Sequence, residues 1–374
     1  MLFLSAGEVS GDTYAADLLA QLQCQLHAPC FGLGGPALQA AGQIQLANVL
    51  AYSAVGLTEN LHHLRYFKAL LARCKAWLRQ CRPQAVILVD FQGFNLQLGR
   101  YARELGIPVF YYIAPQAWIW RAPGDLRRIA RSCDLILSVF LREHVFYQQQ
   151  GLNSHFVGHP LLQRLAPFTP ETPSNTTHQN RIAPTLCWLA GSRTLEIQRL
   201  APILRTLIGH SQNHPALRHY HHVLPVATPA LGRTLKPWFK DLSVDFISAA
   251  DRYSAMANSQ AVIGASGSAI LEAVLLKKPT IALYQVSSLT YAVAKHLVKT
   301  PWITLPNLLL QRPLVPEFIQ HLEAADILQA LHHLSAAPFV AAHPELVAQL
   351  GASEASTLAA QTIMTYLRKR ESSC

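Results

Sequence analysis

The amino-acid sequence predicts an α/β protein built on doubly wound parallel sheets. Short uninterrupted apolar runs such as "AVILV" (residues 85–89) are typical of strands covered on both faces, as in parallel sheets. Stretches with helical periodicity separate these runs, and such strand–helix alternation favours a doubly wound sheet. At 374 residues the chain is too long for one compact core, so two domains are expected.

The alternation occurs twice, on either side of a stretch rich in Pro, Thr and Asn at residues 166–184, which predicts a linker. The sequence therefore predicts domains at 1–165 and 185–335, followed by a helical tail at 336–374. Because ligands bind at the carboxyl ends of such sheets, we expect a site in a cleft that the two domains face. The expected strands lie in "LFLSA", "CFGLG", "AVILVD", "IPVFYYIA", "DLILSVF", "SHFVG", "TLCWLAGSR", "YHHVLPVA", "VDFIS", "QAVIGAS" and "PTIALYQ".

Two helices of the first half carry further expectations. Asp12 is a plausible N-cap for the helix "DTYAADLLAQLQ". In residues 56–83, apolar side chains three and four positions apart predict a core-facing stripe. Tyr66, Leu70 and Trp77 fall outside it among basic residues, which suits an anionic membrane surface; the alternative is a helix buried on two sides. The stripe consists of Leu57, Leu61, Leu64, Phe67, Leu71, Cys74 and Leu78.

Composition limits the partners and the compartment. Thirty-one Lys and Arg against 21 Asp and Glu give a net charge of +10, which attracts nucleic acid, anionic membranes or phosphorylated substrates. No recognisable nucleic-acid module is present. We find no apolar run of membrane-spanning length, no basic leader, and seven scattered cysteines without a C-x-x-C pair. These features predict a cytoplasmic protein without a zinc site, and the "HYHH" cluster is expected to be structural.

Three glycine-containing turns could hold a ligand. Gly191, Ser192 and Arg193 lie between a strand and a helix, where amides and a guanidinium suit a phosphate; the alternative is an ordinary turn with a solvated arginine. Ser266 and Gly267 repeat this arrangement, and Glu272 is expected in the first helical turn, facing ribose hydroxyls or only complementing the helix dipole.

The third turn is "SAGEVSGD" (residues 5–12), which matches neither nucleotide-binding glycine pattern. Its Glu8, Ser10 and Asp12 suit sugar hydroxyls better than phosphate. Asp90 ends a buried strand in the same predicted domain, and it is either a catalytic group or a polar strand end.

Taken together, these motifs resemble the lipid-A-disaccharide synthase family, inverting glycosyltransferases with the GT-B arrangement of two Rossmann-like domains. The resemblance covers residues 5 to 320 in the family's order. It consists of "AGEVSGD", "GLGGPALQAAG", "VGLTENL", "DFQGFN", "APQAWIWR", "FVGHPLL", "LAGSR", "ASGSAILEAVLLKKP", "LVKTPWITLPNLLL" and "LVPEFIQ".

The resemblance implies transfer of 2,3-diacylglucosamine from UDP to the 6-hydroxyl of 2,3-diacylglucosamine 1-phosphate. It implies no cofactor or metal, a peripheral position on the inner face of the cytoplasmic membrane, and a homodimer with exchanged C-terminal portions. Arg193 with Ser266 and Gly267 would hold the diphosphate, and Glu272 the ribose. The other substrate-binding residues that it implies are Ser10, Gly11, Asn95, Gln116, His159, Ser192 and Asn307.

One motif departs from the family pattern. Members read Asp-x-Pro-Asp-Phe-Asn where this sequence has "DFQGFN" (residues 90–95), so Gly93 stands where the general base is expected. Asp90 and Glu8 are the catalytic candidates, with His159 a further one. Two alternatives remain open: another UDP-sugar enzyme, either a transferase to a different lipid acceptor or an epimerase, and a GT-B protein that binds ligand without catalysis.

Overall fold

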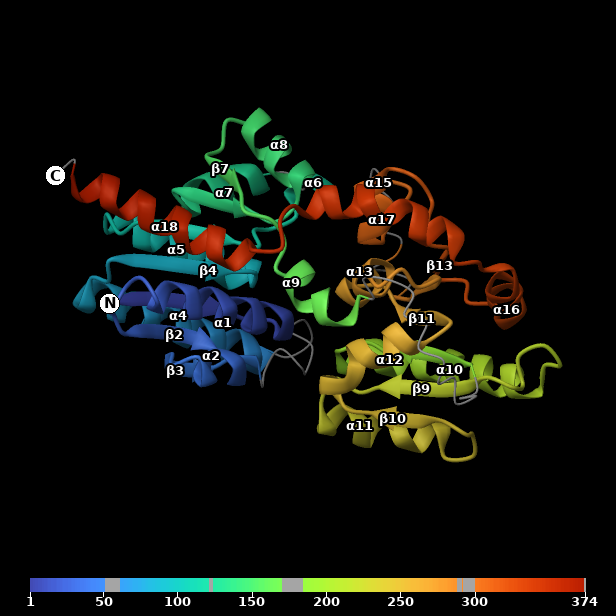
Figure 1. The fold of residues 1–374 in the computed structure, drawn as a ribbon. Coiled ribbons are helices and arrows are strands. Elements are labelled where there is room, and N and C mark those ends of the chain that lie inside the picture. Colours follow the sequence, from blue (N-terminus) through green and yellow to red (C-terminus); the bar gives the residue numbers. More distant parts are fainter. Residues whose placement is uncertain (51–60, 121–123, 170–183, 288–290, 292–299, 373–374) are drawn as a thin grey trace. The chain divides into compact units, whose positions relative to one another are not determined.

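The computed structural model describes residues 1–50, 61–120, 124–169, 184–287, 291 and 300–372, and it divides into two compact units (Figure 1). Unit 1 contains residues 1–163 and 348–374, and unit 2 contains residues 164–347. Each unit is built on a parallel sheet, as the sequence predicted. None of the helices in the described ranges is long and apolar enough to cross a membrane.

Unit 1 holds a seven-stranded sheet in the order β3-β2-β1-β4-β5-β6-β7. The chain moves outward from β1 to β3 and then returns to place β4 on the other side of β1, so the strand order reverses between these two strands. All ten residues of β1 and β4 are buried, because helices cover both faces of the sheet. The strands are β1 (Leu2–Ala6), β2 (Cys30–Gly34), β3 (Ile44–Asn48), β4 (Ala85–Val89), β5 (Val109–Tyr112), β6 (Leu135–Ser138) and β7 (Ser154–Phe156).

The C-terminal helix α18 belongs to unit 1, where it packs along α1 (Figure 1). Helices α4, α5 and α7 contribute side chains to the apolar cluster that also contains β1 and β4. The helices of this unit are α1 (Val9–Gln23), α2 (Pro36–Ala40), α4 (Leu61–Cys81), α5 (Gln92–Glu104), α6 (Ala117–Trp120), α7 (Asp125–Ser132), α8 (Leu141–Gln149) and α18 (Ala355–Glu371), and α9 (Leu161–Leu165) crosses into unit 2.

Unit 2 holds a six-stranded sheet in the order β10-β9-β8-β11-β12-β13, and its strand order reverses between β8 and β11. Its strands are β8 (Thr185–Leu189), β9 (His221–Pro225), β10 (Asp245–Ile247), β11 (Ala261–Ala265), β12 (Thr280–Tyr284) and β13 (Glu317–Ile319). Its helices are α10 (Thr194–Asn213), α11 (Pro229–Leu235), α12 (Arg252–Asn258), α13 (Ser268–Leu275), α15 (Leu305–Leu310), α16 (Ala324–His333) and α17 (Ala337–Leu350). The last residues of α17 belong to unit 1. Residues 170–183 of the predicted linker lie outside the described ranges.

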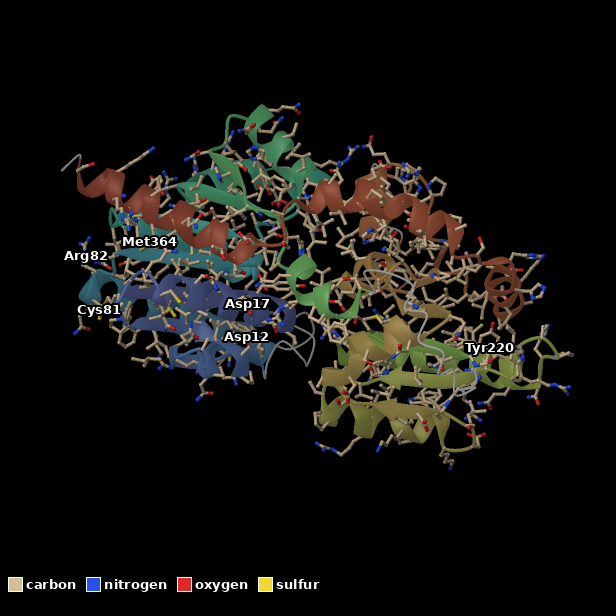
Figure 2. The ribbon with its side chains drawn as sticks, viewed as in Figure 1. Asp12, Asp17, Cys81, Arg82, Tyr220 and Met364 are labelled. Carbon is tan, nitrogen blue, oxygen red and sulfur yellow. The ribbon has the colours of Figure 1, made fainter. Side chains whose placement is uncertain are left out.

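Asp12 has a different role from the predicted one. Helix α1 begins at Val9, so the prediction that Asp12 is its N-cap was wrong. Asp12 is buried on α1 (labelled in Figure 2), and its carboxylate accepts backbone N–H bonds from Gly35 (2.6 Å) and Ala37 (2.9 Å). These donors surround the start of α2, so Asp12 caps a neighbouring helix rather than its own.

Helix α4 is buried over a different face from the predicted one. The expected core residues Cys74 and Leu78 are buried, but Leu64 is 56% exposed; Leu57 lies outside the described residues. The prediction that Tyr66, Leu70 and Trp77 are exposed was wrong, and the alternative of a more widely buried helix is closer to the structure.

The reason lies in the apolar residues of the sheet. Leu70 is buried, and Tyr66 and Trp77 pack partly buried against the same core. The Trp77 ring lies 5.3 Å from the ring of Phe3 and 5.2 Å from that of Phe31. Because β1 and β2 present these rings to α4, the indole gains more by covering them than by facing water.

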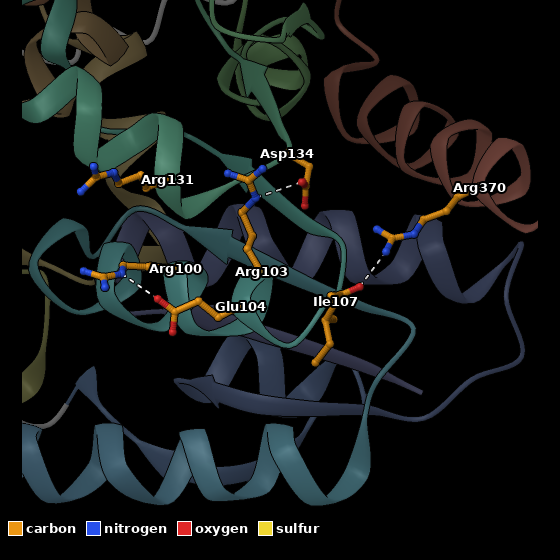
Figure 3. A pocket seen from close by; sticks show the side chains of 8 residues that line it. Arg100, Arg103, Glu104, Ile107, Arg131, Asp134 and Arg370 are labelled. Carbon is orange, nitrogen blue, oxygen red and sulfur yellow. Dashed lines mark hydrogen bonds and ion pairs between the residues drawn. The ribbon is translucent and has the colours of Figure 1, made fainter. Parts of the chain in front are cut away.

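Several arginines line a pocket of unit 1 (Figure 3). Two of them, Arg103 and Arg370, bind protein groups near the ends of helices. Arg103 donates to the Ala130 carbonyl near the end of α7 and pairs with Asp134 at 3.0 Å. Arg370 of α18 donates to the Gly106 carbonyl just after α5 (2.7 Å). Guanidinium groups are favourable near helix carboxyl ends; the Arg103 contacts join α5 to the end of α7, and the Arg370 contact holds α18 against the end of α5.

The core of unit 2 contains a buried histidine. Trp188 Nε1–H donates to Nδ1 of His222 (3.0 Å), and Nε2 of His222 lies 3.4 Å from Ser211 Oγ. Burial lowers the pKa of His222 to about 4, so the ring is neutral in the folded protein. The expectation of a structural role for the "HYHH" cluster is confirmed for this member.

We expect His222 to make unit 2 acid-sensitive. The unfolded chain protonates the imidazole near its ordinary pKa of about 6.5, whereas the folded unit resists down to about 4, so stability is lost as the pH falls through this range. At pH 4.5 the loss relative to neutral pH is about 2 kcal/mol. Native-state hydrogen exchange of β8 and β9 at pH 7 and 4.5 measures it. H222Q should reduce the pH dependence, the exposed control H219Q should keep it, and equal pH dependence in all three proteins would contradict the assignment.

Candidate active site

Several of the candidate residues lie at the two positions where strand order reverses. In open α/β sheets, ligands bind outside the carboxyl ends of the strands at such a switch point. In unit 1 the point lies between β1 and β4, where residues 7–12 and Asp90 follow their strands. In unit 2 it lies between β8 and β11, where the Gly191 and Ser266 turns follow theirs.

Asp90 and Phe91 have unusual backbone conformations. They follow β4 with φ angles of 44° and 50°, in the left-handed region that residues other than glycine rarely adopt. Such strain persists only where surrounding contacts fix it, and it is frequent at functional sites. The turn directs the Asp90 side chain toward the start of α1.

Asn95 and Tyr111 hold this turn. The Asn95 amide nitrogen donates to the carbonyls of Val89 (3.1 Å) and Asp90 (2.9 Å), and its carbonyl oxygen accepts from Ser5 Oγ (2.7 Å). Tyr111 Oη donates to the Asp90 carbonyl (2.8 Å). Asn95 is fully buried and joins β1 to β4, so its position serves the geometry of Asp90; its substrate contact stays a prediction.

The Asp90 carboxylate has one bound and one unused oxygen. Oδ1 accepts the Gly7 backbone N–H (3.1 Å), whereas Oδ2 is buried without a hydrogen-bond partner among the described residues. Desolvation, and then the negative charge of Glu8, raises the pKa of this carboxyl well above its ordinary value. A carboxylate of this kind can accept a proton from a bound hydroxyl.

The glycines of "SAGEVSGD" make room for this arrangement. A Cβ at Gly11 would overlap Oδ2 of Asp90, and a Cβ at Gly7 would overlap the ring of Phe91. Glu8 is the exposed N-cap residue of α1, and Ser10 is half-buried in its first turn. The structure therefore brings Glu8, Ser10, Gly11 and Asp90 together.

His159 is a weak candidate for the base. It is buried, its Nδ1 accepts the Leu161 N–H (3.1 Å), and its ring contacts Tyr14 edge-on. Burial lowers its pKa to about 3, which makes the imidazole a poor proton acceptor. Gln116 is half-buried in the turn after β5, and its substrate contact stays a prediction.

Gly93 lies in the first turn of α5 with open space beside it. A Cβ at this position would meet no other described atom within 4 Å. The backbone at this position therefore leaves room for the first atom of a side chain.

In unit 2 the first turn precedes α10. Gly191 has a φ of 101°, and the exposed Ser192 and Arg193 follow, with Arg193 as the N-cap residue of the helix. The Ser192 N–H donates to the carboxylate of Glu196 (3.1 Å), which shapes the turn.

The second turn lies beside the first because β11 pairs with β8. A Cβ at Gly264 would overlap the Leu189 carbonyl, so only glycine permits this close approach. Gly267 is the exposed N-cap residue of α13, and Ser266 N–H donates to the Leu283 carbonyl (2.9 Å). Two adjacent helix N-termini with an arginine suit a diphosphate.

Glu272 lies deeper than predicted. It is the fifth residue of α13, so its placement in the first turn was wrong. The side chain is 3% exposed; Oε1 receives Arg252 Nη2 at 3.3 Å, and Oε2 has no hydrogen-bond partner among the described residues. Burial raises its pKa, against the lowering effect of Arg252 and Arg164.

Asn307 is already engaged within the protein. Its amide nitrogen donates to the Val315 carbonyl (2.8 Å) and to Glu317 (2.8 Å). Its oxygen accepts the N–H groups of Leu314 and Val315, both at 2.8 Å. The amide therefore fixes the loop that follows α15, and its contact with ligand stays a prediction.

Sequence reasoning missed Tyr111 and Arg252. Tyr111 reads as one apolar residue of a buried strand, and Arg252 is separated from Glu272 by twenty positions. No local signal links either residue to its partner. Within the described residues, no group of three or more His, Cys, Asp or Glu side chains could hold a metal ion.

The fold is shared with solved UDP-sugar enzymes. UDP-GlcNAc 2-epimerase from Neisseria meningitidis, solved with UDP-GlcNAc, matches with a TM-score of 0.64 at 12% identity over 98% of this chain and 100% of that one. This likeness shows the fold, and it places the chain in the GT-B class of two Rossmann-like domains. The expected GT-B fold class is thereby confirmed.

Sequence comparison defines the family. A model described as lipid-A-disaccharide synthetase matches residues 2–338. Lipid-A-disaccharide synthase 1 of Legionella pneumophila (strain Lens) is 36% identical over 84% of this chain and 83% of its own length. Lipid-A-disaccharide synthase of Anaeromyxobacter dehalogenans (strain 2CP-C) is 34% identical over 98% of this chain and 97% of its own length. The chain belongs to the lipid-A-disaccharide synthase family, whose members are UDP-dependent glycosyltransferases, and the predicted resemblance is confirmed.

The glycines supply a matched pair of variants. We expect G11A to displace the Asp90 carboxylate, because the added methyl group overlaps Oδ2, and to lower turnover at least tenfold. G93A should leave turnover unchanged, because its methyl group enters open space. Turnover and melting temperature of both variants are the measurements. Equal activity of G11A and G93A would contradict the placement of Asp90.

Proposed function

We propose that the protein transfers 2,3-diacylglucosamine from UDP-2,3-diacylglucosamine to the 6-hydroxyl of 2,3-diacylglucosamine 1-phosphate. The products are the β-1,6-linked disaccharide 1-phosphate and UDP. The observation that carries the catalytic part is the Asp90 carboxylate with its raised pKa, at the switch point of unit 1. Membership in the lipid-A-disaccharide synthase family supports this reaction over epimerisation or binding without catalysis.

In this proposal residues 185–335 bind the donor. Ser192, Arg193, Ser266 and Gly267 hold the diphosphate at the N-termini of α10 and α13, which stabilise the charge that develops as UDP leaves. Glu272 accepts a hydrogen bond from the ribose. Asn307 lines the donor site through the loop that it holds.

Residues 1–165 bind the acceptor, with Ser10, Gln116 and His159 as contacts. Asp90 takes the proton from the acceptor 6-hydroxyl as its oxygen attacks the anomeric carbon of the donor sugar. The bond from that carbon to the diphosphate oxygen breaks, and UDP leaves with the electron pair. Glu8 is the second candidate for the base, since its carboxylate lies close enough to raise the pKa of Asp90.

The reaction is tested with the two acylated sugars in detergent, without added metal. We expect equimolar UDP and disaccharide 1-phosphate, detected by mass. UDP release without disaccharide would point to another acceptor, and bound UDP-sugar without turnover would indicate a protein that only binds it.

The base is tested by D90N. Removing a general base lowers the rate by a factor of about 10² to 10⁴, so kcat should fall within that range while KM changes little. In the wild type, kcat/KM should rise with pH through the raised pKa of Asp90, above the range of an ordinary carboxyl, because only the ionised form accepts a proton. The acidic limb should disappear in D90N. Near-wild-type turnover of D90N, together with a large loss in E8Q, would assign the base to Glu8.

We also propose that the protein binds peripherally to the inner face of the cytoplasmic membrane, as a homodimer. Exposed basic side chains on α4, among them Arg65, Lys68 and Arg79, support the attraction to anionic lipid. Because Trp77 and Leu70 are engaged in the core, this attraction is electrostatic in character.

Binding to anionic vesicles should therefore weaken with salt and with charge reversal on α4. We expect K68E/R79E to lose most sedimentation with vesicles that contain 30% phosphatidylglycerol, about 1 kcal/mol per basic residue, and no protein to sediment with neutral vesicles. A double variant in the other unit, R218E/R233E, is the control. Equal losses in both would mean that net charge, rather than α4, drives binding.

A further inference from the structure

Glu272 is held from one side only. Its side chain is 3% exposed, whereas that of its partner Arg252 is 37% exposed, so the pair joins a buried carboxylate to a guanidinium at the surface. Nη2 of Arg252 lies 3.3 Å from Oε1. Oε2 accepts no hydrogen bond from any residue in the described ranges and is out of contact with solvent. A buried carboxylate oxygen in this state is costly unless a ligand satisfies it.

Arg252 is itself fixed in orientation. Its Nη2 also lies 2.6 Å from the hydroxyl of Tyr253, and its guanidinium carbon lies 4.4 Å from the centre of the Tyr253 ring. The Tyr253 ring in turn packs against Phe168, with 5.6 Å between ring centres. A guanidinium held by stacking and by a hydroxyl loses little freedom when it pairs with a carboxylate.

Glu272 lies close along the chain to the turn of Ser266 and Gly267, which is the proposed diphosphate site. Helix α13 begins directly after Gly267, and Glu272 lies five positions after that glycine, a rise of about 7.5 Å along the helix. Anions bound at the helix start and a hydroxyl bound at Glu272 would therefore belong to one ligand. A nucleoside diphosphate carries both groups at such a separation.

We propose that Arg252 is a positioning residue for nucleotide recognition: it holds Oε1 of Glu272 so that Oε2 faces a ribose hydroxyl. The inference rests on the proposed function, in which this unit binds the UDP donor. Arg252 touches the carboxylate and not the nucleotide. After its loss, Arg164 of α9 would be the remaining compensating cation of Glu272 among the described residues, with the Tyr253 hydroxyl of α12 nearby.

The test compares UDP with 2′,3′-dideoxy-UDP by calorimetry on the full chain. We expect the wild type to bind UDP at least tenfold more tightly, because only UDP offers a hydroxyl to the charged Oε2. R252Q should weaken UDP about tenfold and leave dideoxy-UDP unchanged, so that discrimination is lost. R252K should retain part of the preference for UDP over dideoxy-UDP. The control R218Q, at an exposed arginine, should retain all of that preference.

The pH profile separates positioning from general structural damage. Without Arg252, which lowers the pKa of Glu272 against the effect of burial, the carboxyl holds its proton to higher pH. UDP affinity of R252Q should therefore recover with rising pH, at a higher pH than any corresponding change in the wild type. A structural defect in R252Q would weaken both nucleotides at every pH and would overturn the inference.

Y253F keeps the inference testable if R252Q does not fold. This variant retains the ring under the guanidinium and removes the hydroxyl that orients it, so we expect a partial loss of discrimination. If R252Q, or both R252K and Y253F, preferred UDP over dideoxy-UDP as strongly as the wild type does, the proposed role of Arg252 would be overturned. The proposed donor site would not be affected by that result. A wild type that does not bind UDP would overturn the proposed donor site together with the role of Arg252.

Discussion

The hydrogen bonds of one buried amide, that of Asn95, organise the candidate site of unit 1. Asn95 bonds to Ser5 of β1 and to the carbonyls at the end of β4, and it thereby closes the switch point of the sheet. The left-handed conformation of Asp90 is tolerable because Asn95 and Tyr111 both bind its carbonyl. The glycines of the α1 turn then admit the carboxylate. Without this amide, the strained turn would keep the Tyr111 hydroxyl on the Asp90 carbonyl and the Gly7 N–H on its carboxylate.

The second unit repeats this plan with different chemistry. At its switch point lie two helix N-termini and Arg193, a positively polarised arrangement that suits an anion. Helix α13 also carries a second buried carboxylate, Glu272, which like Asp90 has one oxygen bound and the other without a partner among the described residues. Burial raises the pKa of both carboxyls; the negative charge of Glu8 adds to this effect at Asp90, whereas Arg252 and Arg164 oppose it at Glu272. Neighbouring charge thus acts in opposite directions on the two buried carboxyls.

Many elements follow from local pattern, and the exceptions have a common cause. Strands buried on both faces, such as β4 and β11, were predicted because their apolar runs are unbroken. The two strands that were missed, β3 and β13, lie at sheet edges and are partly exposed, so their sequences carry no such run. The buried face of α4 was misjudged for a related reason: Trp77 packs on rings that β1 and β2 supply, which helical periodicity does not reveal.

The sequence by itself determined the doubly wound fold class, the repetition of that fold, the glycine turns and the family resemblance, because short-range patterns encode each of them. Tertiary structure alone decided which oxygen atoms remain available. Asp12 caps a helix that begins more than twenty residues later, and Glu272 pairs with an arginine of another helix. The side-chain amide of Asn307 binds backbone groups of the loop that follows α15. These pairings depend on how strands and helices pack in three dimensions, and the free energy of a buried polar group depends on the partner that packing brings to it.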